Sequence, residues 1–397
     1  MKILVINAGS SSVKFQLIDM ASKKLIAKGS SQRIGLSGSE TVVKANGQVY
    51  EFMQDLPTHS DSMKLILGAL TDSKKGVIKS LDEISGFGHR FVSGGPDYKL
   101  PMLLNEGLLN ELEGLKSFAP LHMSANVLGV RACMLTAPSI PNVAVFDTGF
   151  YRHMPAKAKV YAIPYEFYEN NKLQRQGAHG ISHDYVSAQL ARLMNKDIKD
   201  LKLITCHIGN GASISAVNKG ICVDTSMGLT PLEGLVMGTR SGDIDPALVA
   251  SICEIKNCTV QEAINILNKE SGLLGISGIS SDIRDILKES ETNERAKLAI
   301  DVFVYRIKKY IGSYAAVMGG VDGIAFTAGS GENRDDIREA VMENMEYLGV
   351  DFDFEGNRNF ERGVDYCISK PNSKVAVWVV PTDEEMMIAN ETLKLIK

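Results

Sequence analysis

KILVINAGSSSVKF, residues 2–15, joins an apolar, β-branched run to a turn of small residues and then to a second extended pattern. The apolar run ends at Asn7, and Gly9 permits a tight turn with a close backbone approach to a ligand. The serines of the turn offer hydroxyl groups, and Lys14 adds a point charge that suits a phosphate. The stretch predicts a strand–turn–strand phosphate grip, with an ordinary hairpin at a sheet edge as the alternative. It is not a P-loop, because the sequence contains no GxxxxGK[ST].

The opening pattern returns near the middle of the chain. KLITCHIGNGASISAVNKG, which starts at Lys202, aligns with the segment that starts at Lys2 and places His207 over Asn7. A third strand candidate follows each hairpin, at residues 24–28 and 220–224. Two such hairpins separated by half the chain predict a duplicated domain with a phosphate grip in each half. The second, glycine-rich turn can also present successive backbone N–H groups to an anion.

Composition limits the classes of function. A chain of 397 residues predicts two domains, and a net charge of −4 gives no reason to expect nucleic acid or an anionic membrane as a partner. No apolar run approaches the ~20 residues of a membrane-spanning helix. The chain opens directly into a strand with no secretory leader, and its six cysteines lack metal-type spacing and are expected to be reduced thiols. We therefore expect a cytoplasmic protein.

Strand and helix patterns alternate between and beyond the two hairpins. Short apolar runs predict strands, and apolar residues at helical spacing behind a capping residue predict helices. Alternation of this kind predicts an α/β fold with mixed sheets flanked by helices. The predicted strands are 142–146, 323–327 and 374–380, and the predicted helices are 183–194, 299–317 and those that start near Asp245-Pro246, Ser281-Asp282 and 381–385.

Four of the predicted strands end in polar or glycine-rich positions. Asn7, Asp147, His207 and the turn at Gly329 each follow a strand directly. Ligands of open α/β sheets bind beyond the carboxyl ends of the strands, so these positions are predicted to serve one cleft. For Asp147 alone, a plain turn residue is the alternative.

Three further side chains are candidates for anion binding. Arg240 lies in a glycine-punctuated turn, and Arg90 lies on a predicted strand, where a carboxylate or phosphate would satisfy its charge. His179 lies in a turn before a helix, and its i, i+4 spacing to His183 lacks the third ligand of a metal site. Glu384 falls in a first helical turn, where the helix dipole alone also favours an acidic residue.

Taken together, these segments resemble the acetokinase family, of the superfamily that joins acetate and sugar kinases with actin and heat-shock chaperone ATPases. The similarity runs from end to end. It implies duplicated actin-like (ribonuclease H-like) lobes with a cleft between them: residues 1–150 with the C-terminal helix 385–397, and residues 151–384 with the nucleotide site. It also implies a homodimer. The segments that carry it are 7–14, 146–148, 207–213, 224–234, 238–246, 271–286, 326–333 and 381–385.

The resemblance implies reversible transfer of the γ-phosphoryl group of ATP to acetate or another short-chain carboxylate. It also implies Mg²⁺ or Mn²⁺, with Asn7 and Glu384 as its ligands or as partners of its water ligands. Arg90 and Arg240 are implied to hold the carboxylate and the phosphoryl group, and His179 to stabilise the transition state. Asp147 is implied as a base or an orienting group. Because a carboxylic acid with a pKa of ~4 to 5 is already ionised at neutral pH, orientation is favoured. The implied ATP-binding residues are Ser10, Ser12, Lys14, His207, Ile208, Gly209, Asn210, Gly211, Asp282, Ile283, Arg284, Gly329, Ser330, Gly331, Glu332 and Asn333.

The chain departs from the family pattern near the acyl site. The family's F-H-G-T-S-H has Ala178 in place of its Phe, and the family's R-V-V-H-G-G-E lacks its Glu here, with Asp97 one residue late. The missing ring predicts a roomier pocket that accepts propionate or a longer acyl chain; Met123 refilling the space is the alternative. The other implied members of the pocket are Arg90, Val92, Leu121 and Pro231.

A regulatory actin-like or chaperone-like ATPase is the competing class of function. The phosphate hairpins alone permit it. Arg90, Arg240 and His179 argue against it, because ATP hydrolysis requires no pair of cations for an acyl carboxylate.

Overall fold

The computed structural model describes residues 1–116 and 122–397, which form two compact units. The first consists of Met1–Arg152 with Asp383–Lys397, and the second of His153–Thr382. Asp383 and Glu384 thus have their contacts in the first unit. The sequence analysis placed both residues in the second lobe. Within the described part of the chain, no helix is long and apolar enough to cross a membrane.

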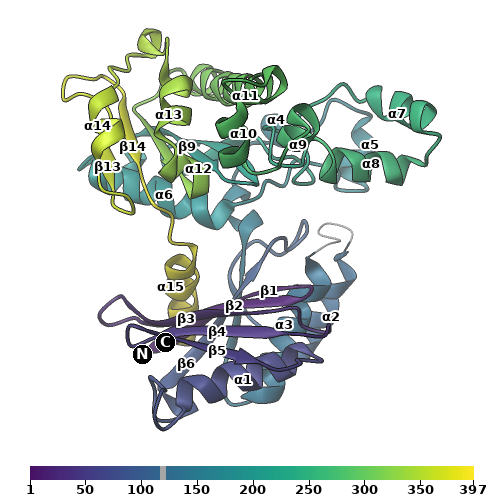
Figure 1. The fold of residues 1–397 in the computed structure, drawn as a ribbon, viewed down its shortest axis with the longest axis vertical. Coiled ribbons are helices and arrows are strands. Elements are labelled where there is room, and N and C mark those ends of the chain that lie inside the picture. Colours follow the sequence, from purple (N-terminus) through teal and green to yellow (C-terminus); the bar gives the residue numbers. More distant parts are fainter. Residues whose placement is uncertain (117–121) are drawn as a thin grey trace. The chain divides into compact units, whose positions relative to one another are not determined.

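The first unit is built on an eight-stranded mixed sheet in the order β5-β4-β3-β2-β1-β6-β8-β7 (Figure 1). Strand β1 is antiparallel to β2 and parallel to β6, and β6 is parallel to β8. The strands are β1 (Lys2–Gly9), β2 (Ser12–Asp19), β3 (Lys24–Gln32), β4 (Glu40–Ala45), β5 (Gln48–Met53), β6 (Ile84–Phe91), β7 (Met102–Leu103) and β8 (Asn142–Phe146). The helices are α1 (His59–Thr71), α2 (Glu106–Gly114), α3 (Met123–Thr136) and α15 (Glu384–Ile396), with 3-10 turns η1 (Leu81–Glu83) and η3 (Asp147–Tyr151).

Helix α15 packs closely against β6, and two glycines of β6 make the close approach possible. A Cβ atom on Gly88 would lie 2.7 Å from Cγ2 of Ile388 and 2.5 Å from Oγ1 of Thr392, and one on Gly86 would lie 2.9 Å from Cδ1 of Ile396. The alternate residue Phe87 points to the other face of the sheet, into the core formed with α1. The close packing fixes the first residue of α15, Glu384, relative to the carboxyl end of β6.

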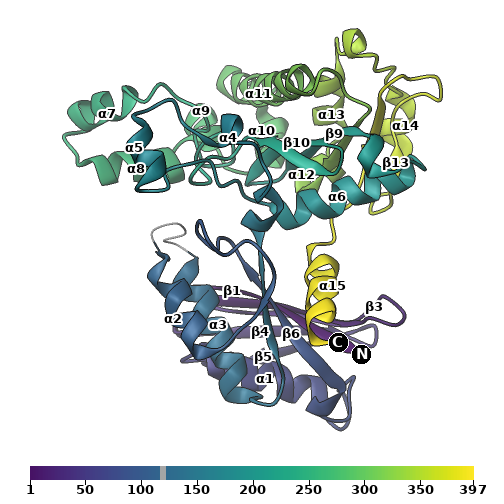
Figure 2. The same ribbon diagram turned by 180° about the vertical axis from the view of Figure 1, so that it is seen from behind.

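The second unit is built on a six-stranded mixed sheet in the order β11-β10-β9-β12-β14-β13. Helices α6 and α11 contact this sheet and lie on its opposite faces (Figure 2). The strands are β9 (Lys202–Ile208), β10 (Ala212–Asn218), β11 (Ile221–Thr225), β12 (Gly323–Thr327), β13 (Tyr366–Cys367) and β14 (Ala376–Val379). The helices are α4 (Ala156–Lys159), α5 (Tyr165–Glu169), α6 (Gly180–Leu193), α7 (Leu248–Lys256), α8 (Val260–Lys269), α9 (Gly272–Ser277), α10 (Ile283–Glu289), α11 (Glu294–Met318), α12 (Ala328–Asn333), α13 (Asp335–Met342) and α14 (Phe354–Asn359), with 3-10 turns η4 (Ile198–Asp200) and η5 (Glu346–Leu348).

The two sheets share one topology, which confirms the duplication predicted from the hairpins. In each, three consecutive antiparallel strands are followed by two strands parallel to the first: β3-β2-β1-β6-β8 and β11-β10-β9-β12-β14. Asn7 pairs with Lys14 and His207 pairs with Ser213, one pair nearer to its turn than Asn7 is. The predicted α/β fold with mixed sheets flanked by helices is confirmed. The helix predicted to start at Asp245-Pro246 begins later, at Leu248, after a turn.

His89, buried on β6, makes the stability of the first unit depend on pH. Its Nε2 atom lies 2.7 Å from Oδ1 of Asn142, and burial lowers its pKa from 6.5 to about 4. Between about pH 6.5 and pH 4 the unfolded chain therefore binds a proton that the folded chain does not, so stability falls as the pH falls through this window. We expect a loss of ~3 kcal/mol from this residue.

The test is denaturant unfolding of the wild type and His89→Gln at ~pH 7 and ~pH 4.5. The variant is expected to be less stable at neutral pH and to lose less stability on acidification; His183 also has a pKa lowered by burial, so some dependence persists. His153→Gln, at an exposed position, is the control and should follow the wild type. An unchanged acid dependence in His89→Gln would contradict the assignment.

Candidate active site

The carboxyl ends of three parallel strands bring predicted site residues together in the first unit. Asn7, Arg90 and Asp147 lie at the corresponding ends of β1, β6 and β8. Asn7 and Arg90 line one pocket of about 460 Å³, together with Lys14 and Glu384. Four residues predicted for phosphate, metal and carboxylate therefore share a single cavity in this unit.

Arg90 forms ion pairs with two acidic residues. Its Nη2 atom lies 2.8 Å from Oδ2 of Asp147, and its Nε atom lies 3.5 Å from Oε2 of Glu384. The side chain of Asp147 is only 1% exposed, so this contact is nearly dry. Burial by itself lowers the pKa of Arg90, but the charges of Asp147 and Glu384 outweigh it and raise the pKa. Asp147 thus holds the guanidinium of Arg90, and the role expected from the sequence, ordering the metal and the substrate, stays a prediction.

Side chains from two helices hold the hairpin turn that precedes Ser12. The carbonyl of Gly9 lies 2.8 Å from Nε2 of His59. The side-chain amide of Asn126 donates to the carbonyl of Ala8 at 3.1 Å. A Cβ atom on Gly9 would lie 2.8 Å from Oγ of Ser12, so a side chain here would displace the Ser12 hydroxyl. Ser10 is exposed at the tip of the turn. The loop that the sequence predicted to bind phosphate is thus held in one conformation.

The second unit contains a pocket of about 720 Å³ that gathers half of the residues predicted to bind ATP. Arg284 and Asp282 line it and bond each other, and the hydrogen bond from the Arg284 side chain lowers the pKa of Asp282 to about 2. The predicted residues that line the pocket are Gly209, Asn210, Asp282, Ile283, Arg284, Gly329, Ser330 and Asn333. Of the other predicted residues in this unit, His207, Ile208, Gly211, Gly331 and Glu332 do not line it.

Several walls of this pocket come from residues that the sequence analysis did not name. Leu273 and Phe303 add apolar surface, and Arg334 and Arg362 add positive charge. Apolar surface suits a purine ring, and arginines suit phosphates. A signal existed for Leu273, which lies in the family segment 271–286, but Phe303 on α11 looks in sequence like any core residue of an amphipathic helix.

Glu332 and its neighbours shape the turn at the start of α12. Oε1 of Glu332 accepts hydrogen bonds from the backbone N–H groups of Ala328 at 2.8 Å and Thr382 at 3.2 Å. Ala328 has φ of +64°, a strained conformation for a residue with a side chain. The buried Arg338 donates to the carbonyls of Gly331 and Glu332 at 2.9 and 3.0 Å. These contacts hold the turn that presents Gly329 and Ser330 to the pocket.

His179 and Arg240 converge on the glycine-rich turn after β9. A Cβ atom on Gly211 would lie 3.6 Å from Nε2 of His179 and 3.6 Å from Nη1 of Arg240. His179 precedes α6 with φ of 58°, and its ring stacks on His207 with centroids 4.1 Å apart. His207 thus supports His179 and does not line the nucleotide pocket.

Arg240 keeps most of its hydrogen-bonding capacity unused. Its Nη1 atom contacts the carbonyl of Pro231 at 3.5 Å and the sulfur of Met237 at 3.6 Å, both weak contacts. No carboxylate of the described residues lies within 4.0 Å of its guanidinium. Burial lowers the pKa of Arg240. A desolvated guanidinium with open donors is suited to bind an anion bidentately.

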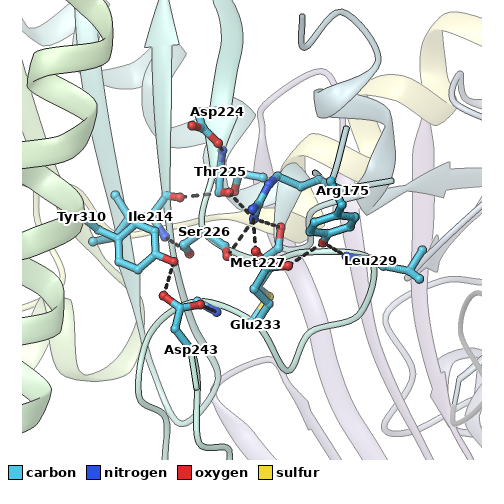
Figure 3. A network of polar contacts seen from close by, with 12 residues as sticks. Arg175, Ile214, Asp224, Thr225, Ser226, Met227, Leu229, Glu233, Asp243 and Tyr310 are labelled. Atoms are coloured by element: carbon cyan, nitrogen blue, oxygen red, sulfur yellow. Dashed lines mark hydrogen bonds and ion pairs between the residues drawn. The ribbon is translucent and has the colours of Figure 1, made fainter. Parts of the chain in front are cut away.

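A network around Arg175 fixes the segment that leads to Arg240 (Figure 3). Nη1 of Arg175 donates to three successive carbonyls, those of residues 225–227, at 3.0 to 3.2 Å. Its Nη2 atom donates to Oε1 of Glu233 at 2.5 Å, and the hydroxyl of Tyr161 donates to Oε2 of the same carboxylate at 2.5 Å. Arg175 thus ties the end of β11 to the loop that carries Pro231.

The far end of this loop is held by Asp243, as Figure 3 also shows. Its Oδ1 atom accepts from the N–H of Gly234 at 2.8 Å, and its Oδ2 atom accepts from the hydroxyl of Tyr310 at 2.6 Å. Gly234 has φ of +112°, which only glycine adopts readily. With both ends fixed, the loop holds Pro231 and Arg240 in defined positions. The sequence analysis gave neither Arg175 nor Glu233 a role.

Glu233→Gln is expected to destabilise the second unit by ~1–3 kcal/mol, because it leaves the charge of Arg175 without its carboxylate. The pair is partly exposed, so the lower part of this range is favoured. We also expect kcat/KM to fall about tenfold through displacement of Arg240. Denaturant unfolding and steady-state kinetics measure the two effects. Asp351→Asn, which breaks the exposed pair with Lys370, is the matched control and should change neither; equal behaviour of the two variants would contradict the prediction.

The predicted acyl pocket is described only in part. Ala178 is 5% exposed in the core of the second unit, beside His179, and Pro231 is half-buried next to Arg240. Val92 is half-buried at the end of β6, and Asp97 is exposed. Leu121 lies outside the described residues.

Two compact units with one duplicated topology and a large pocket at a glycine-rich turn, lined by arginines of the second unit, define a phosphotransferase of the actin-like class. The model of the acetokinase family matches residues 2–390. The chain belongs to the acetokinase family, as the sequence analysis predicted, and it is a kinase.

Relatives match this chain over its full length. The acetate kinase of Clostridium beijerinckii is 51% identical over 400 residues, covering 100% of both chains. The crystal structure of Porphyromonas gingivalis acetate kinase is 44% identical with a TM-score of 0.95, covering 100% of both chains. The crystal structure of a propionate kinase from Francisella tularensis is 39% identical with a TM-score of 0.91, covering 99% of both.

Proposed function

We propose that the chain catalyses reversible transfer of the γ-phosphoryl group of ATP to acetate, giving acetyl phosphate and ADP. A carboxylate oxygen of acetate forms a bond to the γ-phosphorus, and the bond from that phosphorus to the oxygen bridging the β- and γ-phosphates breaks. The single observation that carries the proposal is Arg240, desolvated and open beside His179 at the glycine-rich turn. Acetate kinases related over the whole chain support acetate as the acceptor.

The residues suit phosphoryl transfer, which depends on positioning and on neutralising the equatorial oxygens. ATP binds in the pocket of the second unit, with the apolar wall of Leu273 and Phe303 for its base. Arg240 neutralises charge on the transferred phosphoryl group, and His179 donates a hydrogen bond to it. Arg90, oriented by Asp147, binds the acetate carboxylate, which is already ionised and requires no base.

The donors near Arg90 fit a hard divalent cation. Asn7 offers an amide oxygen and Glu384 a carboxylate in the same pocket. Among the described residues, no group of three or more His, Cys, Asp or Glu could hold a metal. The two oxygen ligands of Asn7 and Glu384 fit Mg²⁺, which proteins hold through one or two carboxylates plus substrate phosphates. Asn7 and Glu384 would hold Mg²⁺, or Mn²⁺ with the same oxygen ligands, and the cation would supply charge neutralisation at the phosphates.

Hydroxylamine trapping tests the reaction. Incubation with ATP, Mg²⁺ and acetate is expected to yield acetyl hydroxamate, and omission of acetate is expected to abolish both the hydroxamate and ADP release. ADP release that is equally fast without any carboxylate, with no hydroxamate formed, would instead establish the competing regulatory ATPase.

A preference for propionate is the second candidate, and Ala178 supports it. The residue is small where the family pattern has Phe, and a propionate kinase is among the solved relatives. Met123, the alternative residue for refilling the space, is 1% exposed in a core cluster of the first unit with Phe91 and Val127, and this packing opposes its movement. One methylene changes binding by only ~1–3 kcal/mol, so a broadened preference is expected, without a strict switch.

A series of kcat/KM values for acetate, propionate and butyrate decides between the two acceptors. A roomier pocket predicts that propionate is used within about tenfold of acetate. A steep decline directly after acetate would exclude the second candidate and leave the first intact.

We extend the proposal to a homodimer in the cytoplasm, as the family resemblance implies. Ile255 on α7 and Val260 on α8 are 80% and 63% exposed, and a partner would cover such apolar side chains. All six cysteines are free thiols, which suits a reducing compartment. Sedimentation should give twice the chain mass of 43.1 kDa.

A further inference from the structure

A chain of buried hydroxyl and imidazole groups ends on His179. Oγ of Ser213 lies 2.9 Å from Nδ1 of His179 and 2.8 Å from Nε2 of His183. Oγ1 of Thr205 lies 2.7 Å from Nδ1 of His183. Thr205, His183 and Ser213 are each 0% exposed, so water does not compete for these bonds. The four residues form one hydrogen-bonded line from the centre of the sheet to His179.

Thr205, at the inner end of this line, determines which group donates in each of its hydrogen bonds. Among the described residues, Nδ1 of His183 is the one hydrogen-bond acceptor within reach of the Thr205 hydroxyl, so the hydroxyl donates to it. A neutral imidazole has one donor and one acceptor nitrogen, and burial keeps His183 neutral by lowering its pKa well below 6.5. Nε2 of His183 therefore carries the proton and donates to Ser213. Ser213 has its own proton left for Nδ1 of His179.

We propose that Thr205, His183 and Ser213 are positioning residues that hold neutral His179 in the tautomer with its proton on Nε2. That atom lies with Arg240 beside Gly211, where it donates to an oxygen of the transferred phosphoryl group. The expected effect on kcat rests on the proposed function, whereas the assignment of the tautomer does not.

If donor and acceptor were exchanged in every hydrogen bond of this line, His179 would work against the reaction. The exchange would protonate Nδ1 of a neutral His179 and turn the lone pair of Nε2 toward an anionic phosphoryl oxygen, replacing a hydrogen bond by repulsion. Turning the ring over does not relieve this, because it carries Nδ1 away from Oγ of Ser213, which it contacts at 2.9 Å. The line thus supplies a donor at Nε2 without requiring a charged imidazole.

Imidazole ¹⁵N NMR of the wild-type protein tests the tautomer directly. With ¹⁵N-labelled histidine, the His179 signals are identified by their loss in His179→Gln. Neutral His179 is expected to show a protonated Nε2 and an unprotonated Nδ1, and Ser213→Ala is expected to give a mixture of tautomers. A protonated Nδ1 in the neutral wild type, or unchanged His179 signals in Ser213→Ala, overturns the proposal.

Matched substitutions separate the hydroxyl groups from packing. Thr205→Val removes the donor with little change in shape and is expected to lower kcat about tenfold with KM values within about twofold, a part of the ~10²–10³ that a lost oxyanion donor costs. Thr205→Ser keeps the hydroxyl and should restore kcat to within about twofold of the wild type. Ser215→Ala, which removes another buried hydroxyl of β10, bonded to Thr225, is the control and should retain normal kcat.

The outcomes distinguish this inference from the proposed function. Equal kinetic loss in Thr205→Ser and Thr205→Val, or loss in Ser215→Ala as large as in Ser213→Ala, overturns the relay and leaves acetate phosphorylation standing. A wild type that forms no acyl hydroxamate overturns the proposed function, while the NMR result still decides the tautomer.

Discussion

Arg240→Ala is expected to lower kcat by ~10³-fold or more, the scale measured for arginines that act on a transferring phosphoryl group. The guanidinium is desolvated, makes only weak contacts at 3.5 and 3.6 Å, and lies with His179 at the glycine-rich turn. Its donors are therefore available to charge that develops in the transition state. Arg240 does not line the nucleotide pocket, so the KM for ATP should stay within about threefold of the wild type.

Two further variants make this result specific. Arg240→Lys keeps the charge but loses the planar fork, and we expect it to recover only a small part of the lost kcat. Arg358→Ala removes an exposed arginine of the same unit, paired with Glu339, and should leave kcat unchanged. A folded Arg240→Ala with near-normal turnover would falsify the assignment. An increase in the KM for ATP with unchanged kcat would place Arg240 in nucleotide binding instead.

The parts of the fold that the sequence predicted are those encoded by local pattern. The two hairpins are predictable because an apolar run, a glycine turn and an alternating strand lie within one short segment, and both segments form antiparallel hairpins in the structure. The end of β8 was found for the same reason, since Asp147 follows it directly. Strand ends are visible in sequence, and parallel pairing then brings them to one edge of the sheet.

The parts of the site that the sequence did not predict depend on contacts between distant segments. Glu233 pairs with Arg175 across 58 positions, and no local pattern marks the partner of either residue. The spacing of His179 and His183 was noticed, but it suggested a metal pair with no third ligand. The structure links the two rings through Ser213, which lies on strand β10, 30 positions beyond His183 of helix α6. Phe303 was missed because a residue lining a pocket and a residue filling a core share the same helical pattern.

Asp147→Asn is the second large expected effect. The substitution keeps the shape of the side chain but removes the charge that lies 2.8 Å from Arg90 in a site where the Asp147 side chain is 1% exposed. Removing one partner of a buried pair costs ~3–5 kcal/mol, and we expect the lower end because Glu384 still lies 3.5 Å from Arg90. With the guanidinium no longer held by Asp147, kcat should fall by ~10²-fold or more, since a misplacement of about 1 Å has this effect.

Loss of stability and loss of catalysis must be separated for Asp147→Asn, because one contact serves both. Kinetics are therefore measured well below the unfolding transition of the variant, which denaturant unfolding locates. Glu83→Gln, which breaks the more exposed ion pair with Lys2 in the same unit, is the matched control and should cost at most ~1 kcal/mol with normal kcat. The double variant Asp147→Asn with Arg90→Met tests the coupling: if Asp147 acts through Arg90, adding Asp147→Asn to Arg90→Met should lower kcat little further. Full additivity of the two losses would mean that Asp147 has a role in the reaction independent of Arg90.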